Sequence, residues 1–222
     1  ATSVKIGRSK KSPKLHDADI PIRVGVNWGS VPTKIKEQYK NNPQDAILIL
    51  AEKEIATLEA ASFKNIVVSL KCFELPLLIE ANRLFSERYD YPLHIGVTEA
   101  GLPEDGIVRS AVGIGALLAE GIGDTIRVSL TGDPVCEIAV CKKILESLDL
   151  IEHKGISYIS CPTCARTKID VENIAKRVKE RLKDYSSDIK IAVMGCEVNG
   201  PGEAKEADIG IAGGKGYGII FR

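Results

Sequence analysis

Three cysteines in the last third of this 222-residue chain give its clearest chemical signal. Cys161 and Cys164 form a C-x-x-C pair, and Cys196 follows in a loop that contains three glycines and a proline. A C-x-x-C turn brings two thiolates within reach of one metal centre, and the third cysteine can close on the same centre. Such a loop could wrap a bulky inorganic core, because glycine and proline give tight turns that expose backbone amides.

The spacing of the cysteines leaves three interpretations open. A structural zinc site requires four Cys or His ligands, and besides His153 this part of the sequence offers no fourth. The C-x-x-C pair could instead be a redox dithiol. The third interpretation is an iron–sulfur cluster with one ligand that is not a cysteine. Cys136 and Cys141, five positions apart in a helical pattern, are predicted to be buried small hydrophobic residues.

A second group of polar residues is expected at the ends of successive strands. They are Arg23 and Asn27, Lys71, Glu99 and Arg127. In a barrel, the C-terminal ends of the strands meet at one mouth, where such enzymes place their chemistry. An open sheet would spread the same residues along its edge. Charged and polar residues at the ends of four strands would meet at the mouth of a barrel, so we favour the barrel.

The elements that position these residues alternate between buried strands and helices. Strands are expected at residues 22–26, 66–70, 93–97 and 125–130. Helices are expected at residues 43–61, 75–89 and 107–120, with a fourth that opens on an N-cap and first-turn proline at 133–134. The fourth helix is expected to bury the face formed by Val135, Ile138, Ala139, Ile144, Leu145 and Leu148. Four successive units indicate parallel strands with right-handed crossovers, which predicts half of a (β/α)8 barrel, with a doubly wound sheet as the alternative.

The pattern changes after about residue 150. A strand at 156–160 leads into Cys161, a charged helix is expected at 170–185, and a strand at 189–194 leads towards Cys196. Two more apolar runs follow at 209–212 and 219–221. The sequence therefore predicts two domains, 1–150 and 151–222, the second a small α+β domain with its cysteines in loops after strands.

Composition limits the classes of function. Thirty basic residues balance thirty acidic ones, which argues against a general nucleic-acid binder. No run of about eighteen apolar residues indicates a membrane span, and the first 14 residues lack the apolar centre of a secretory signal. Six cysteines are too few for a disulfide scaffold of this length and indicate a reducing compartment, the cytoplasm.

Five motifs stand out, in chain order PIRVGVN, HIGVTEAG, EGIGDTIRVSLTGDP, CPTC and MGCEVNGPGEAKEADIGIAGG. Together they resemble the family of 4-hydroxy-3-methylbut-2-enyl diphosphate synthase, also called IspG or GcpE. The resemblance implies a barrel that binds the substrate diphosphate, followed by an iron–sulfur domain. It also implies the conversion of 2-C-methyl-erythritol 2,4-cyclodiphosphate to hydroxymethylbutenyl diphosphate in the non-mevalonate isoprenoid pathway, by two-electron reductive ring opening and loss of a hydroxyl.

The resemblance also implies roles for individual residues. Three thiolates and one carboxylate would hold a [4Fe–4S] cluster: Cys161, Cys164, Cys196 and Glu203. A carboxylate is a hard, exchangeable ligand, so it leaves one iron open to a substrate oxygen. Glu99 would act as an acid or base beside the cluster. The substrate-binding residues would be Arg23, Asn27, Lys71, Arg127 and Asn199.

The chain departs from the family pattern in length. The family has roughly half a barrel more on the N-terminal side, so the chain resembles the C-terminal portion of the compact bacterial type, and its activity alone is in doubt. The resemblance implies a homodimer and reduced ferredoxin or flavodoxin as electron donor. A zinc-stabilised binding module and a simple electron-transfer domain are the competing hypotheses.

Overall fold

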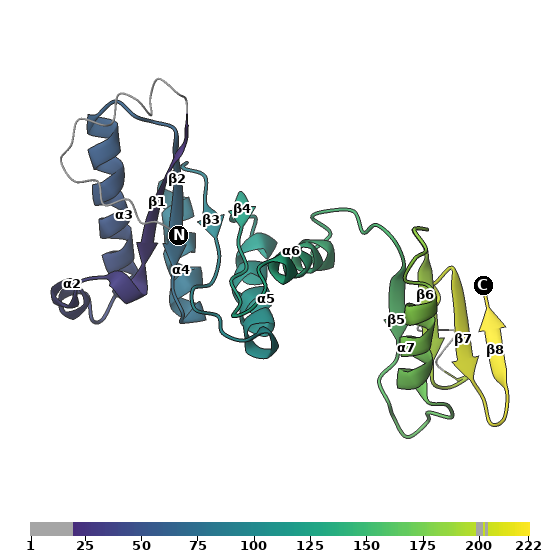
Figure 1. Ribbon diagram of the computed structural model, residues 1–222. Helices are drawn as coiled ribbons and strands as arrows, with labels where there is room; N and C mark the ends of the chain where they lie inside the picture. Colours follow the sequence, from purple (N-terminus) through teal and green to yellow (C-terminus); the bar gives the residue numbers. More distant parts are fainter. Residues whose placement is uncertain (1–19, 199–201, 203) are drawn as a thin grey trace. The chain divides into compact units, whose positions relative to one another are not determined.

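The computed structural model describes residues 20–198, 202 and 204–222, and the chain divides into two compact units (Figure 1). The first unit ends at Ile151 and the second begins at Glu152. Each unit has its own hydrophobic core. In the described part of the chain, no helix is long and apolar enough to cross a membrane.

Four parallel strands organise the first unit. They are β1 (Ile22–Asn27), β2 (Ile66–Lys71), β3 (His94–Ile95) and β4 (Thr125–Ile126). β1 pairs with β2, β3 pairs with β4, and a bridge between Val68 and Leu93 joins the two pairs. The strands therefore follow one another in chain order, without the reversal of strand order that defines a doubly wound sheet.

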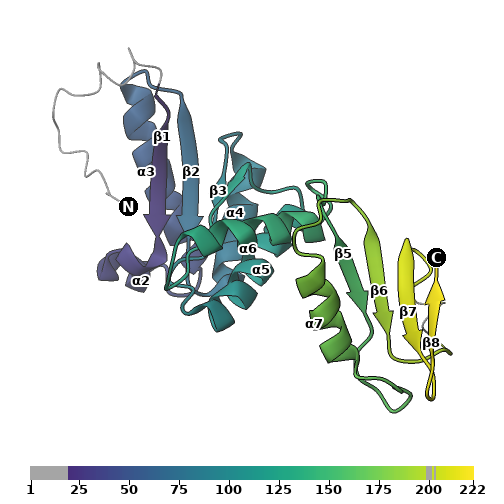
Figure 2. The same ribbon diagram turned by 45° about the vertical axis from the view of Figure 1, so that its right-hand side comes forward.

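A helix follows each strand of this unit. In chain order these are α3 (Pro43–Ala60), α4 (Leu75–Arg88), α5 (Pro103–Ala119) and α6 (Val135–Ser147). The connection from β1 also contains the 3-10 turn η1 (Trp28–Ser30) and α2 (Thr33–Gln38). α3 packs on α4, α4 on α5 and α5 on α6, as Figures 1 and 2 show. Because helices that are consecutive in sequence touch one another, they line up on one face of the strands.

The core of the first unit lies between the strands and these helices. Alternate strand residues point into it, among them Val24, Val26, Val68, Leu70 and Ile95, each at most 8% exposed. Alternation follows from the two-residue period of a strand. The remaining strand residues, with the opposite parity, therefore face away from the helices.

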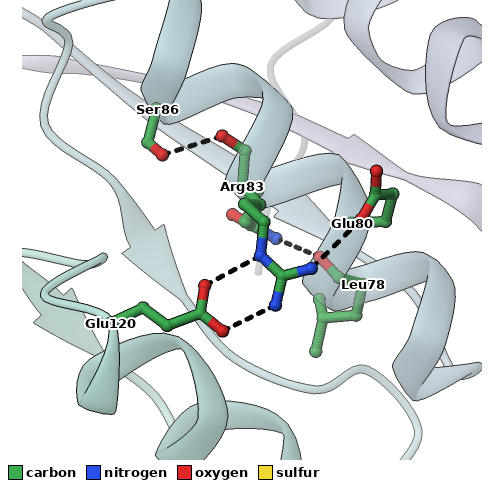
Figure 3. A network of polar contacts seen from close by, with 6 residues as sticks. Leu78, Glu80, Arg83, Ser86 and Glu120 are labelled. Atoms are coloured by element: carbon green, nitrogen blue, oxygen red, sulfur yellow. Dashed lines mark hydrogen bonds and ion pairs between the residues drawn. The ribbon is translucent and has the colours of Figure 1, made fainter.

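An exposed ion-pair network links α4 to the end of α5 (Figure 3). The Arg83 guanidinium donates from Nε and Nη2 to the two carboxylate oxygens of Glu120, at 2.8 and 2.6 Å, and its Nη1 lies 3.2 Å from Glu80. The side chains of Arg83 and Glu120 remain about two-fifths exposed, so this ion pair contributes little to stability.

The second unit is a four-stranded sheet with one helix. The strands β5 (Ser157–Ser160), β6 (Lys190–Met194), β7 (Ile209–Gly213) and β8 (Gly218–Phe221) lie in that order. The first three are parallel and β8 is antiparallel to β7. α7 (Val171–Arg181) connects β5 to β6 and packs on both. Asp170 caps this helix by accepting a hydrogen bond from the Asn173 amide at 3.0 Å.

Three expectations about the elements of the first unit are corrected. The third and fourth strands are shorter than residues 93–97 and 125–130, because regular pairing ends at Ile95 and Ile126. The backbones remain close beyond that point, since the Arg127 amide donates to Ile95 at 2.9 Å. A Cβ on Gly96 would lie only 2.4 Å from the Arg127 carbonyl oxygen. α5 begins at Pro103, before residue 107, because the proline starts the first turn.

The expected buried face of α6 is correct only towards the end of the helix. Ile144 is 6% exposed, whereas Val135 and Ile138 are 72% and 59% exposed. The reason is that partial burial against the core begins with Val140 and Cys141. Cys136 is exposed and Cys141 only half-buried, so the expectation that both are buried is wrong.

Candidate functional site

The first unit carries a polar face on the side of its strands away from the helices. Strand pairing places Asn27 directly opposite Lys71. Arg23, four residues before Asn27 on β1, has the same parity and faces the same side. His94 lies opposite Thr125 on the next pair of strands. Arg127 follows Thr125 with the same parity, so the polar side chains of four strands share one face.

The charges on this face are all positive. Burial, followed by the charges of Arg127 and Arg23, lowers the pKa of Lys71 from 10.5 to about 8. Burial, followed by Lys71, Arg23 and Arg127, lowers the pKa of His94 from 6.5 to about 4. Within the described residues, none of these three cations forms a salt bridge to a carboxylate. Clustered cations without acidic partners form a site suited to an anion.

Arg127 has a donor that is still available. Its Nε is buried and makes no hydrogen bond in the described structure. Guanidinium groups bind phosphate and carboxylate in two-pronged geometry. An anionic ligand on this face would therefore satisfy a group that the protein itself leaves unpaired.

Glu99 lies in the loop that follows β3, at the C-terminal ends of the strands. The preceding residue, Thr98, accepts a hydrogen bond from the Asn27 side chain at 3.2 Å, and its amide approaches the Cys72 carbonyl at 3.4 Å. These contacts attach the loop to the ends of β1 and β2. Glu99 is exposed and has a φ of +56°, a left-handed conformation that is strained for a residue with a Cβ. Strain of this kind is often kept at functional sites.

The second unit places Cys161 and Cys196 after the ends of neighbouring parallel strands. Ser160, the residue before Cys161, pairs with Val193 of β6. The Gly195 amide donates to the Cys161 sulfur at 3.0 Å, which joins the two loops directly. Cys196 is 8% exposed. The backbone of the Cys196 loop is therefore bonded to the side chain of the Cys161 loop.

Cys164 is held in a turn whose hydrogen bonds favour its thiolate. The Thr167 hydroxyl accepts from the Cys164 amide at 3.0 Å and lies 3.8 Å from its sulfur. Hydrogen bonds from the Arg166 amide and the Thr167 side chain lower the pKa of this thiol. The same turn is attached to the Cys196 loop, because the Lys168 amide donates to the Gly195 carbonyl at 2.8 Å.

The three thiols fit a thiolate-bound inorganic centre by their chemistry. All are free, and hydrogen bonds reach the sulfurs of Cys161 and Cys164. Among residues 20–198, 202 and 204–222, no three His, Cys, Asp or Glu residues are grouped so as to hold a single metal ion. Asn199 and Glu203 lie outside the described residues, so their predicted roles carry no structural observation.

The motifs and spacings of the sequence did not single out His94 as a site residue. The structure places it on the cationic face, with Nδ1 2.8 Å from the Thr125 hydroxyl and Nε2 buried without a partner. Strand parity was the available signal, since His94 alternates with the buried residues Leu93 and Ile95.

Fold and site together define a class: an α/β protein whose first unit presents a cationic face at its strands and whose second unit presents three free thiols in loops after its strands. The chain belongs to the GcpE family. The model of the GcpE TIM-barrel domain matches residues 11–142, and that of the GcpE protein C-terminal domain matches residues 157–222.

Individual relatives agree with this membership. A protein of Clostridium perfringens is 56% identical over 206 residues, 93% of this chain and 59% of the relative. Proteins of Clostridium tetani and Caldanaerobacter subterraneus are 51% and 52% identical over 221 residues, 98% of this chain and 63% and 62% of the relatives. All three are named 4-hydroxy-3-methylbut-2-en-1-yl diphosphate synthase (flavodoxin). The chain thus spans about three-fifths of the length of these relatives.

Proposed function

We propose that the chain is the C-terminal portion of a 4-hydroxy-3-methylbut-2-en-1-yl diphosphate synthase of the compact bacterial type. In this proposal residues 1–150 form part of a TIM-type barrel that binds the cyclic diphosphate, and residues 151–222 hold a [4Fe–4S] cluster. The observation that carries it is the combination of an unpaired cationic face with three free thiols in the two units of one chain. A simple electron carrier would leave that cationic face without a purpose.

The arrangement of the first unit supports the half-barrel. Its strands follow chain order and its helices pack in succession on one face. A complete barrel repeats this pattern eight times and places its chemistry at the C-terminal ends of the strands. In the proposed protein, the rest of the barrel comes from the portion that the relatives have in addition.

The cationic residues have a direct role in binding. Arg23, Lys71 and Arg127 would neutralise the diphosphate, with Arg127 donating its free Nε–H. Asn27, opposite Lys71, would donate from its amide, and Asn199 would bind the substrate from the cysteine loop. The bound diphosphate would in turn raise the pKa of Lys71, because an opposite charge favours the ammonium form.

The cluster would be held by Cys161, Cys164 and Cys196, with the Glu203 carboxylate on the fourth iron. When bound, such a cluster would pass electrons to the substrate one at a time, and the external donor would replace each of the two that the reduction needs. Glu99, at the mouth of the strands, would deliver the proton with which the departing hydroxyl leaves as water. Its position in the loop after β3, and not in a helix, would keep the Glu99 carboxyl at the C-terminal ends of the strands.

Reduced flavodoxin is the proposed electron donor, because the relatives are named for it; reduced ferredoxin is the alternative. A homodimer and a location in the reducing cytoplasm complete the proposal, the latter supported by six free cysteines. The test is turnover: anaerobic full-length protein with reduced flavodoxin should convert the cyclic diphosphate to the open-chain diphosphate. No product from a protein with an intact cluster would refute the activity.

The titration of Lys71 predicts a pH dependence of diphosphate binding. The pKa of Lys71 without bound anion is about 8. Above that pH the lysine must take up a proton when the anion binds. Affinity should therefore fall by up to about tenfold per pH unit above pH 8. Lys71→Arg should remove this additional slope, because a guanidinium stays charged. Isothermal titration of the full-length protein with inorganic diphosphate from pH 7 to 10 measures it. Lys71→Arg is also the control for the ionisation of diphosphate itself, because that ionisation affects both proteins equally. The same dependence of affinity on pH in both proteins would show that Lys71 does not titrate on binding.

A further inference from the structure

The backbone of His94 is fixed from both sides within the strands of the first unit. It pairs in register with Thr125 of β4, and its carbonyl accepts a hydrogen bond from the Ser69 hydroxyl of β2 at 2.8 Å. The residue is 8% exposed. Its ring therefore occupies a defined place on the cationic face.

The two ring nitrogens of His94 have different surroundings. Nδ1 lies 2.8 Å from the Thr125 hydroxyl oxygen. Nε2 is buried and has no hydrogen-bond partner in the described structure, and the same holds for Nε of Arg127. Unpaired buried polar atoms are few in folded proteins. Two of them lie on one face, one on β3 and the other directly after β4, and indicate a ligand group that both of them meet.

The groups that face the ring decide its charge. Lys71, Arg23 and Arg127 all disfavour the imidazolium, and burial adds to their effect, so the pKa falls to about 4 and the ring is neutral at physiological pH. A neutral imidazole carries one proton, on either Nδ1 or Nε2. If the Thr125 hydroxyl donates to Nδ1, the ring proton lies on Nε2. Nε2 is then a hydrogen-bond donor beside the donors of Arg23, Lys71 and Arg127 on the cationic face.

We propose that His94 is a further substrate-binding residue: Thr125 fixes the tautomer, and the Nε2–H of His94 donates to an oxygen of the diphosphate that Arg127 also binds. This inference rests on the proposed function of the first unit as a diphosphate site. It gives the neutral histidine a task that a fourth cation could not perform without more charge repulsion among Arg23, Lys71 and Arg127. Thr125 becomes a positioning residue, since it acts on the ligand only through the ring.

Two isosteric substitutions separate the two nitrogens. Glutamine keeps an amide N–H near the position of Nε2, whereas asparagine keeps only a polar atom near the position of Nδ1. In the full-length protein, His94→Asn should weaken the binding of inorganic diphosphate roughly 10- to 100-fold, the effect of one lost hydrogen bond to a charged group. His94→Gln should stay within about threefold of the unsubstituted protein. Equal, unweakened binding by both variants would overturn the inference.

Substitutions at Thr125 test the tautomer. Thr125→Val removes the hydroxyl and should weaken diphosphate binding, while Thr125→Ser keeps the hydroxyl and should preserve it. Nitrogen NMR of ¹⁵N-histidine-labelled, unsubstituted protein gives a reading that no folding defect can disturb. The signal missing from the His94→Gln spectrum should show a neutral ring protonated at Nε2 and should shift on addition of diphosphate. A proton on Nδ1, or no response to diphosphate, would refute the inference.

Failure of the inference is distinguishable from failure of the proposed function. If the unsubstituted protein binds diphosphate and the His94 and Thr125 variants bind it equally well, only the role of His94 falls. If the unsubstituted protein does not bind diphosphate at all, the anion site of the first unit falls, and the role of His94 falls with it.

Discussion

Full-length protein with serine at position 161, 164 or 196 is expected to contain little iron and sulfide and to show no measurable turnover. A serine hydroxyl is not ionised at neutral pH and is a poor ligand for the soft iron of a cluster, so each substitution removes one of only three thiolates. At position 161 the serine oxygen can still accept from the Gly195 amide, so the loss of iron there would report the missing thiolate. Iron and sulfide analysis of anaerobically prepared protein measures the loss.

Cys136 supplies the matched control for these three substitutions. It is a free and exposed cysteine on α6, so Cys136→Ser removes a thiol from the chain without touching the proposed ligands. This variant should keep the iron, the sulfide and the turnover of the unsubstituted protein. Full iron content in Cys161→Ser, Cys164→Ser or Cys196→Ser would show that the residue is not a ligand.

Turnover of Glu99→Gln is expected to fall by roughly 10²-fold or more, while its iron content stays normal. Glutamine keeps the size and hydrogen-bonding capacity of the side chain but cannot transfer a proton, and a lost general acid or base usually costs this much. The measurement is the steady-state rate with reduced flavodoxin, together with the absorption spectrum of the same sample. Normal turnover would remove Glu99 from the mechanism.

Glu99→Gly distinguishes catalysis from folding at the same position. Glycine adopts a φ of +56° without strain, so the free energy of unfolding should be unchanged or rise by up to about 1 kcal/mol. Turnover should nevertheless fall as in Glu99→Gln. A variant that loses activity and stability together would point to a structural role for the carboxylate instead.

Glu203→Ala is expected to behave differently from both substitutions at Glu99. Three thiolates would still hold a cluster, but the iron without its carboxylate should be labile and easily lost. The iron-to-sulfide ratio should therefore decline on standing, together with turnover. An unchanged ratio and spectrum would exclude Glu203 as a ligand.

Much of the fold could be predicted because its signals are local. Buried β-branched runs marked β1, β2 and β6 to within a residue or two, and the apolar alternation of the strands also gave the parity of Arg23, Asn27 and Lys71. The apolar runs before Cys161 and Cys196 also predicted that these cysteines lie in loops after strands, as the positions of β5 and β6 confirm. These features depend on the residues themselves and on the two-residue period of a strand.

The features that the sequence did not reveal depend on contacts with segments that are distant in sequence. The lengths of β3 and β4 are set by how far pairing extends between them, which no single segment encodes. Burial on α6 depends on where the core reaches that helix, so its apolar periodicity predicted too much burial for Val135 and Ile138. The surroundings of Glu99 and His94 come from segments distant in sequence: the Asn27 side chain donates to Thr98, beside Glu99, and the Ser69 hydroxyl donates to the His94 carbonyl.

One measurement tests the proposed metal centre most directly: the iron, sulfide and zinc content of anaerobically purified full-length protein, read beside its visible spectrum. We expect iron and sulfide in the equal amounts of a [4Fe–4S] cluster, with a broad absorption band near about 400 nm. Loss of both in Cys161→Ser, but not in Cys136→Ser, would assign them to the proposed site. Stoichiometric zinc without sulfide or visible absorption would contradict the iron–sulfur centre, and with it the reductive function.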